Sequence, residues 1–268
     1  MYNKLFFNLA RNSLRYIIRT YKIKEINIPY YLCDEIRHSI IKENCKPVFY
    51  HTDDNFLPTK TFDKNEYILY PDYFGICGKN TEKLCTLYPK MIIDNSHSFY
   101  SEPKGFACFN SARKFLPVYN GSVLWIEKTD NINKYGEDKY IDINDSNYNK
   151  YQAETDFRTA EPAFISEKLK EQIEKFNNLS ERKKKFMSFH EKYQTVNLLN
   201  INPDNVYSPF CYPLLAKDEA TADKFAGELT DKGYEIFRYW NNLPKTYNEY
   251  KFYRNLIPIP LNKIKKPF

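Results

Sequence analysis

The chain has 268 residues, with 40 Lys or Arg against 34 Asp or Glu and therefore a formal net charge of +6. Hydrophobic residues make up 42% of it, including 24 Tyr and 20 Phe, and this much burial surface excludes disorder as the main state. Few of the basic residues are Arg, which argues against a nucleic-acid partner. No apolar run reaches the roughly 18 residues of a membrane span, and no secretion signal is visible at the N-terminus. We therefore expect a cytoplasmic protein that binds neither nucleic acid nor membranes.

Cysteine and histidine spacing does not predict a metal site. The six cysteines form no CxxC pair, and the four histidines are scattered along the chain. Reduced and mostly buried thiols are the default for a cytosolic chain.

The N-terminal half alternates helical and strand-like patterns. Residues 9–22 and 34–42 place apolar side chains at helical spacing, whereas short apolar runs at 26–28, 46–51, 67–70 and 91–93 are typical of strands. Residues 105–125 are again β-like. Strands alternating with helices predict a three-layer α/β/α domain with a largely parallel sheet.

The C-terminal part has a different organisation. Residues 161–194 predict a long amphipathic helix, followed by a strand over 206–215, a helix over 219–232 and a strand over 234–239. We interpret the chain as a large domain over 1–160 and a helix plus small C-terminal α/β domain over 161–268.

Three positions on this scaffold are candidates for chemistry. The helix that begins near Ala10 offers free backbone N–H groups to an anion, and Asn12 and Ser13 add polar side chains. Asp94 follows the strand 91–93 directly, at the sheet edge where α/β proteins bind ligands, although it could equally cap the next helix.

Lys114 is the third candidate. It lies in Ser111-Ala-Arg-Lys-Phe115, among apolar and aromatic neighbours. Desolvation and the adjacent Arg113 would lower the pKa of its amine and favour a nucleophile, while a lysine reaching out to solvent is the structural alternative.

The order of these motifs resembles the DegT/DnrJ/EryC1/StrS sugar aminotransferases, which are fold-type I pyridoxal-phosphate enzymes. The resemblance covers nearly the whole chain, but each motif is degenerate and only their order is specific. The segments that carry it are Asn12–Leu14, Ile28–Cys33, Pro47–Asp53, Tyr73–Gly75, Ile92–His97, Ser111–Phe115, Pro209–Leu214 and Leu256–Pro260.

The resemblance implies a role for each matching residue. Lys114 corresponds to the lysine that binds pyridoxal 5′-phosphate covalently, and Asp94 to the carboxylate that keeps the pyridine nitrogen protonated. His97 stands near the phenolic oxygen of the ring, where Gln is common. Asn12, Ser13 and Ser111 match phosphate-binding positions, and either Tyr31 or Cys33 stacks on the ring.

The resemblance implies amino transfer from an amino acid such as glutamate to a nucleotide-linked keto-sugar, by a homodimer. Ala10 replaces a frequent Gly, and the chain is shorter than a typical member, which weakens the substrate assignment. Two alternatives stay open: a homologue without catalysis or with an altered function, and pyridoxal chemistry on an amino-acid substrate.

Overall fold

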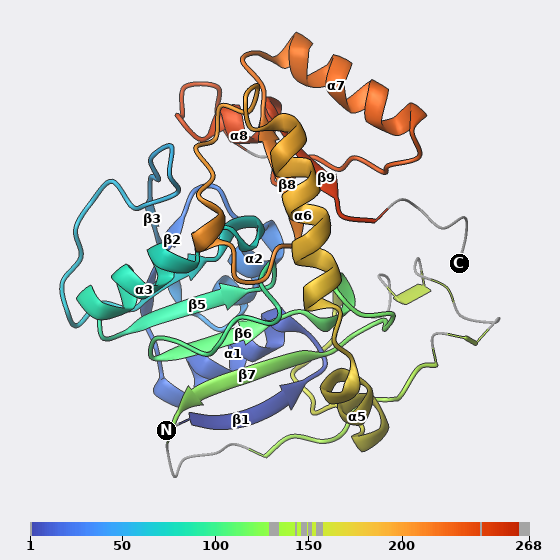
Figure 1. Ribbon diagram of the computed structural model, residues 1–268. Helices are drawn as coiled ribbons and strands as arrows, with labels where there is room; N and C mark the ends of the chain where they lie inside the picture. The colour runs from blue at the N-terminus through green and yellow to red at the C-terminus, as the bar shows by residue number, and fades with distance from the viewer. Residues whose placement is uncertain are drawn as a thin grey trace.

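A computed structural model of the chain describes residues 2–128, 134–142, 144–145, 149, 152–153, 158–241 and 243–262 (Figure 1). Its centre is a seven-stranded sheet of order β1-β7-β6-β5-β4-β2-β3. The strands are β1 (Tyr2–Phe7), β2 (Glu25–Pro29), β3 (Lys46–Tyr50), β4 (Ile68–Pro71), β5 (Met91–Asn95), β6 (Ala107–Asn110) and β7 (Ser122–Glu127).

The sheet is mainly parallel, as the alternation of strands and helices predicts. The strands β3, β2, β4, β5 and β6 pair in parallel, whereas β7 pairs antiparallel with both β6 and β1. The consequence for function is that β4, β5 and β6 end at the same edge of the sheet, and the residues that follow them meet there.

Helices cover both faces of the sheet and make the expected three layers. The helices α1 (Ala10–Tyr21) and α2 (Asp34–Lys42) pack on one face, and α3 (Gly78–Leu87) packs on the other. Strand β5 shows how the sequence serves both layers: Ile92 faces the α1/α2 side, while Met91 and Ile93 belong to the opposite core. Burial on both faces explains why these strands are continuous apolar runs.

A second, two-stranded sheet lies beyond the first. Strands β8 (Cys211–Leu215) and β9 (Leu256–Pro260) pair antiparallel, and the helices α5 (Glu167–Lys175), α6 (Leu179–Tyr193), α7 (Glu219–Asp231) and α8 (Tyr250–Arg254) accompany them. In Figure 1, α6 runs from the seven-stranded sheet up to β8 and β9. A division into two domains at residue 161 stays a prediction.

Several sequence expectations need correction. The helix expected over 161–194 is two helices, because the chain leaves helical geometry at Phe176, between α5 and α6. The strand expected over 234–239 is irregular backbone, and β9 is the partner of β8 instead. The patterns also missed β1 and α3.

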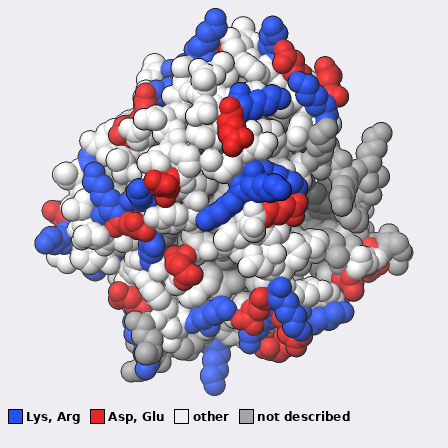
Figure 2. All heavy atoms as spheres, in the orientation of Figure 1, with Lys and Arg blue, Asp and Glu red and all other residues white. Residues whose placement is uncertain are grey.

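The viewed surface carries charges of both signs. Figure 2 shows Lys and Arg side chains interspersed with Asp and Glu on that face. Within the described parts of the chain, no helix is both long enough and apolar enough to cross a bilayer.

Candidate active site

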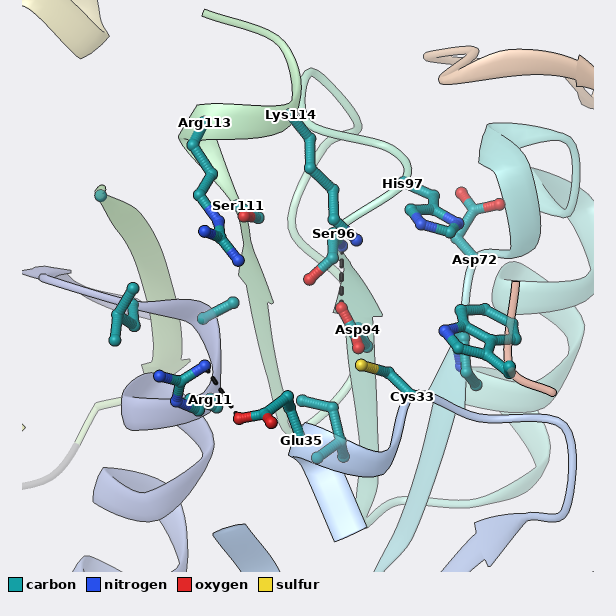
Figure 3. A pocket seen from close by; sticks show the side chains of 16 residues that line it. Arg11, Cys33, Glu35, Asp72, Asp94, Ser96, His97, Ser111, Arg113 and Lys114 are labelled. Carbon is teal, nitrogen blue, oxygen red and sulfur yellow. Dashed lines mark hydrogen bonds and ion pairs between the residues drawn. The ribbon is translucent and has the colours of Figure 1, made fainter. Parts of the chain in front are cut away.

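A pocket with about 700 Å³ of open volume lies beyond the carboxyl ends of β4 and β5 (Figure 3). Its residues come from the start of α1, the turns after β2, β4, β5 and β6, and the irregular segment before α8. Ligands of open α/β sheets bind at this edge, where successive strands end and their connections turn away from the sheet.

Asp94 and Lys114 face each other inside this pocket. Asp94 is the penultimate residue of β5, is only 7% exposed, and accepts a hydrogen bond of 2.8 Å from the backbone N–H of Ser96. Burial raises the pKa of Asp94, and Ser96 and the Lys114 amine oppose that rise. Burial likewise lowers the pKa of Lys114, and Asp94 opposes that fall. Burial thus disfavours the charged form of both groups, and the charge of each group partly offsets this for the other.

His97 closes one side of the pocket as a neutral imidazole. Burial, and next to it the positive Lys114, lower its pKa well below the ordinary value. The ring stacks on Phe210 at 4.5 Å and lies nearly parallel to the indole of Trp240 at 5.5 Å. Its Nε2 is buried and has no hydrogen-bond partner in the described structure. A buried nitrogen of this kind is expected to meet a polar atom of a ligand.

Two arginines form a positive end of the same pocket. Arg11, in the first turn of α1, pairs with Glu35 at 3.1 Å, and Arg113 extends toward it from the turn after β6 (Figure 3). Burial lowers the pKa of Arg11, and the charge of Arg113 is among the causes that add to this. Ser111 lines the pocket on the same side. The combination attracts an anion.

Asn12, Ser13 and Tyr31 do not line this pocket, although the sequence predicts that they bind the cofactor. Asn12 donates to Asn8 Oδ1 at 2.9 Å, and the Ser13 hydroxyl bonds that of Ser122 at 2.8 Å. Their backbone N–H groups donate to the carbonyl of Leu9. Because a helix turns by about 100° per residue, α1 presents Ala10 and Arg11 to the pocket and buries the next two residues.

Of the two candidates for ring stacking, Cys33 lines the pocket and Tyr31 does not. Tyr31 is fully buried, and its hydroxyl donates to the carbonyl of Phe252 at 3.3 Å. The large aromatic ring that does line the pocket, Trp240, comes from the irregular segment before α8.

Of the predicted site residues, the structure therefore brings together Cys33, Asp94, His97, Ser111 and Lys114. Sequence reasoning missed Arg11, Glu35, Asp72 and Trp240, and it noted Arg113 only as a neighbour of Lys114. Asp72 could have been predicted from the sequence, because it directly follows the strand β4, just as Asp94 lies at the end of the strand β5. Trp240 had none, because its segment has no regular pattern.

No family model and no curated protein matches this sequence. Solved structures do match its fold. A Streptococcus pneumoniae protein described as a sugar aminotransferase, in its PLP form, superposes with a TM-score of 0.68 at 13% identity, over 97% of this chain and 82% of that one.

Two further structures show the same likeness. Helicobacter pylori PseC, an aminotransferase of pseudaminic acid biosynthesis, has a TM-score of 0.61 at 16% identity, over 96% of this chain and 81% of its own. A DegT DnrJ EryC1 StrS aminotransferase from Brucella abortus has a TM-score of 0.63 at 14% identity, over 96% and 80%. The chain thus has the fold of the DegT/DnrJ/EryC1/StrS aminotransferases, as its motifs predicted.

Proposed function

We propose that this protein is a pyridoxal-phosphate-dependent aminotransferase that moves an amino group from an amino acid, with glutamate as the expected donor, to a keto-sugar. The observation that carries the proposal is the half-buried Lys114 facing the buried Asp94 at the carboxyl edge of the sheet. A carboxylate and a primary amine held together in a ligand-sized pocket suit an aldehyde cofactor with a basic ring nitrogen.

The other pocket residues fit such a cofactor. The buried Asp94 accepts a hydrogen bond from Ser96 and interacts with the charge of Lys114, but it forms no direct ion pair among the described residues, so a cationic ring nitrogen would complete its partners. The unpartnered Nε2 of His97 offers a hydrogen bond to a ring substituent. Arg11, Arg113 and Ser111 supply donors for a phosphate at the far end from His97 (Figure 3).

Each side chain then has a definite task. The cofactor, when bound, withdraws electrons from the amino-bearing carbon of the substrate. Lys114 Nζ would take the proton from that carbon and deliver it to the former aldehyde carbon of the cofactor, and would carry it in the opposite direction when the amino group passes to the keto-sugar. Its lowered pKa leaves more of the amine unprotonated near neutral pH. Asp94 holds negative charge where the ring nitrogen must stay protonated. His97 orients the ring without adding charge, because its imidazole is neutral.

The keto-sugar acceptor rests on the likeness of fold. Among the structures that superpose on this chain are proteins described as sugar aminotransferases, and PseC is described as acting in pseudaminic acid biosynthesis. These likenesses support a keto-sugar acceptor and a role in amino-sugar biosynthesis. We add from the motif resemblance that the sugar is nucleotide-linked and that the product serves surface-polysaccharide biosynthesis. We extend the proposal to a cytoplasmic homodimer, the arrangement that the motif resemblance implies.

A spectral titration tests the proposal. Purified protein with pyridoxal phosphate should show an absorbance band near the edge of the visible range. Glutamate or another donor should bleach this band, and a keto-sugar should restore it. A protein that binds the cofactor but responds to no donor would be the non-catalytic homologue. Bleaching by a donor, without restoration by any keto-sugar, would favour chemistry on an amino-acid substrate.

A further inference from the structure

A second cavity is lined by Lys114 but not by Asp94. It has about 520 Å³ of open volume, and Lys114 lines both cavities. Its walls come from α6, the start of β8, the segment 235–239 and the end of β9. All of these elements belong to the part of the chain around the small sheet.

The cavity contains a buried cation with no anionic partner. Arg182, on α6, is 7% exposed and donates to the carbonyls of Pro209 at 2.9 Å and Phe210 at 2.6 Å. Its guanidinium carbon lies 4.5 Å from the centre of the Phe115 ring. All three partners are neutral, and the two carbonyls occupy only part of a donor set of five N–H groups.

No carboxylate in the described chain forms an ion pair with Arg182. Glu181, the adjacent residue, pairs with Lys185 at 2.5 Å, and the exposed Glu235 lines the cavity at its rim. The nearby Cys211 thiol stays protonated because burial raises its pKa. Buried charges in proteins are normally paired, since an isolated one costs several kcal/mol. The missing anion is expected to arrive with a ligand.

We infer that this second cavity binds the carboxylate of the amino donor through Arg182, which places the donor's amino group beside Lys114. The inference rests on the proposed function. It implies that a single chain supplies all the residues of the donor site. Arg182 is then a substrate-binding residue, and the apolar walls of Phe210, Phe237 and Tyr239 accommodate the carbon skeleton.

Binding of an unreactive carboxylate tests this without any chemistry. Glutarate has the carboxylates of glutamate but no amino group, and glutaramide is its neutral counterpart. Calorimetric titration of the cofactor-loaded protein should show clear preference for glutarate. Arg182→Gln, which keeps a donor for the Pro209 or Phe210 carbonyl but removes the charge, should weaken glutarate binding at least tenfold, about 1.4 kcal/mol. Arg182→Lys keeps the positive charge and should therefore weaken glutarate binding less than Arg182→Gln does.

Two further variants make the test decisive. Arg238→Gln removes an arginine that pairs with Asp223 on the surface, and it should leave glutarate binding unchanged. Glu235→Lys replaces an exposed rim charge, so it should fold, and it should tighten glutarate binding severalfold without affecting glutaramide. It carries the test if Arg182→Gln does not fold.

The inference is overturned if folded Arg182→Gln binds glutarate like the wild type, if Glu235→Lys changes nothing, or if the wild type binds glutaramide equally well. Repeating the glutarate titration on the protein without cofactor tests the carboxylate site independently of the proposed aminotransferase function. Arg182-dependent glutarate binding by a protein that never takes up pyridoxal phosphate would refute the aminotransferase and keep the carboxylate site.

Discussion

At the scale of single residues, the site depends on a buried carboxylate, Asp94, and a half-buried amine, Lys114, each of which favours the charged form of the other. Lys114 and Asp94 each sit where burial disfavours the ionised form, and each is among the groups that oppose this for the other. Removing one partner of such a pair destabilises the folded protein, because the remaining charge has no compensation, unless the remaining group becomes neutral or gains another counter-charge. Substitutions at the two positions are therefore expected to differ in outcome.

Lys114→Ala should abolish transamination and leave the cofactor bound only noncovalently. The cofactor-loaded variant should still fold, because the amine faces a cavity, no core volume is lost and the ring nitrogen would take over as the counter-charge of Asp94. Without cofactor it should be less stable than the wild type. Borohydride reduction of the loaded wild type, followed by peptide mapping, should place the cofactor on Lys114, with thermal melting as the check on folding. A label found on another lysine would sink the assignment.

Asp94→Asn should reduce chemistry far more than cofactor retention. The phosphate contacts of Arg11 and Arg113 remain, while the ring nitrogen loses its ionic partner. Each unit of pKa lost by that nitrogen corresponds to ~1.4 kcal/mol, so a fall of several units costs orders of magnitude in rate. Stopped-flow measurement of the half-reaction with a donor checks this, and near-normal rates in the variant would count against the role of Asp94.

At the scale of elements, the turn after β4 carries two features that shape the pocket. Asp72 accepts a hydrogen bond of 2.8 Å from the backbone N–H of Cys77, next to the start of α3, and it also lines the pocket. Gly75, three residues later, has a φ of +75° and lies against the backbone of Ser208 and His97. The turn thereby connects the large sheet to the residues that precede β8.

Asp72 should make stability depend on pH. Burial raises its pKa to about 6 from the ordinary 3.8. Below pH ~4 the carboxyl is protonated in both states and costs nothing. As the pH rises to 6 the unfolded chain loses this proton first, so the free energy of unfolding falls by about 3 kcal/mol and stays lower above pH 6.

Asp72→Asn keeps an oxygen for the Cys77 N–H and removes the titration. Urea denaturation should therefore show the variant more stable than the wild type at pH 7.5, by up to about 3 kcal/mol, with little difference at pH 4. The same difference at both pH values would show that the carboxyl is not penalised by burial.

Gly75→Ala should destabilise the protein by roughly 3 to 5 kcal/mol, because the new Cβ would overlap the carbonyl oxygens of Ser208 and His97 in a conformation that disfavours any side chain. Gly227→Ala is the matched control: it lies inside α7 with open space around it and should stabilise by roughly 0.5 to 1 kcal/mol. Denaturant midpoints measure both effects. If Gly75→Ala lowered the free energy of unfolding only slightly, the turn would be able to move away from the residues before β8.

At the scale of the whole molecule, we expect a homodimer. The chain is rich in Tyr and Phe, residues enriched at the cores of interfaces, and twofold pairing is the commonest oligomeric state. Light scattering should give about twice the mass of one 32.1 kDa chain. A monomeric mass in a preparation that still turns over would refute the dimer.

The sequence by itself determined the alternation of α1 and α2 with the parallel strands β2 to β6 and the positions of Asp94 and Lys114, but not β1 or α3. These depend on local patterns: apolar runs mark the strands, and parallel strands bring their ends to one edge. What only the tertiary structure decided is which side chains enter the site. The rotation of α1 turns Asn12 and Ser13 away and presents Arg11, a difference of one or two residues that periodicity does not resolve.

The second cavity is the clearest case of a feature that tertiary structure alone produced. Lys114, Arg182 and Cys211 are far apart in the chain, and in the sequence Arg182 is simply the first residue of a basic run that is typical of a solvated helix face. It is buried because α6 packs beside the start of β8, where two backbone carbonyls and the Phe115 ring surround its guanidinium. Contacts between distant segments follow from packing, and no local pattern encodes them.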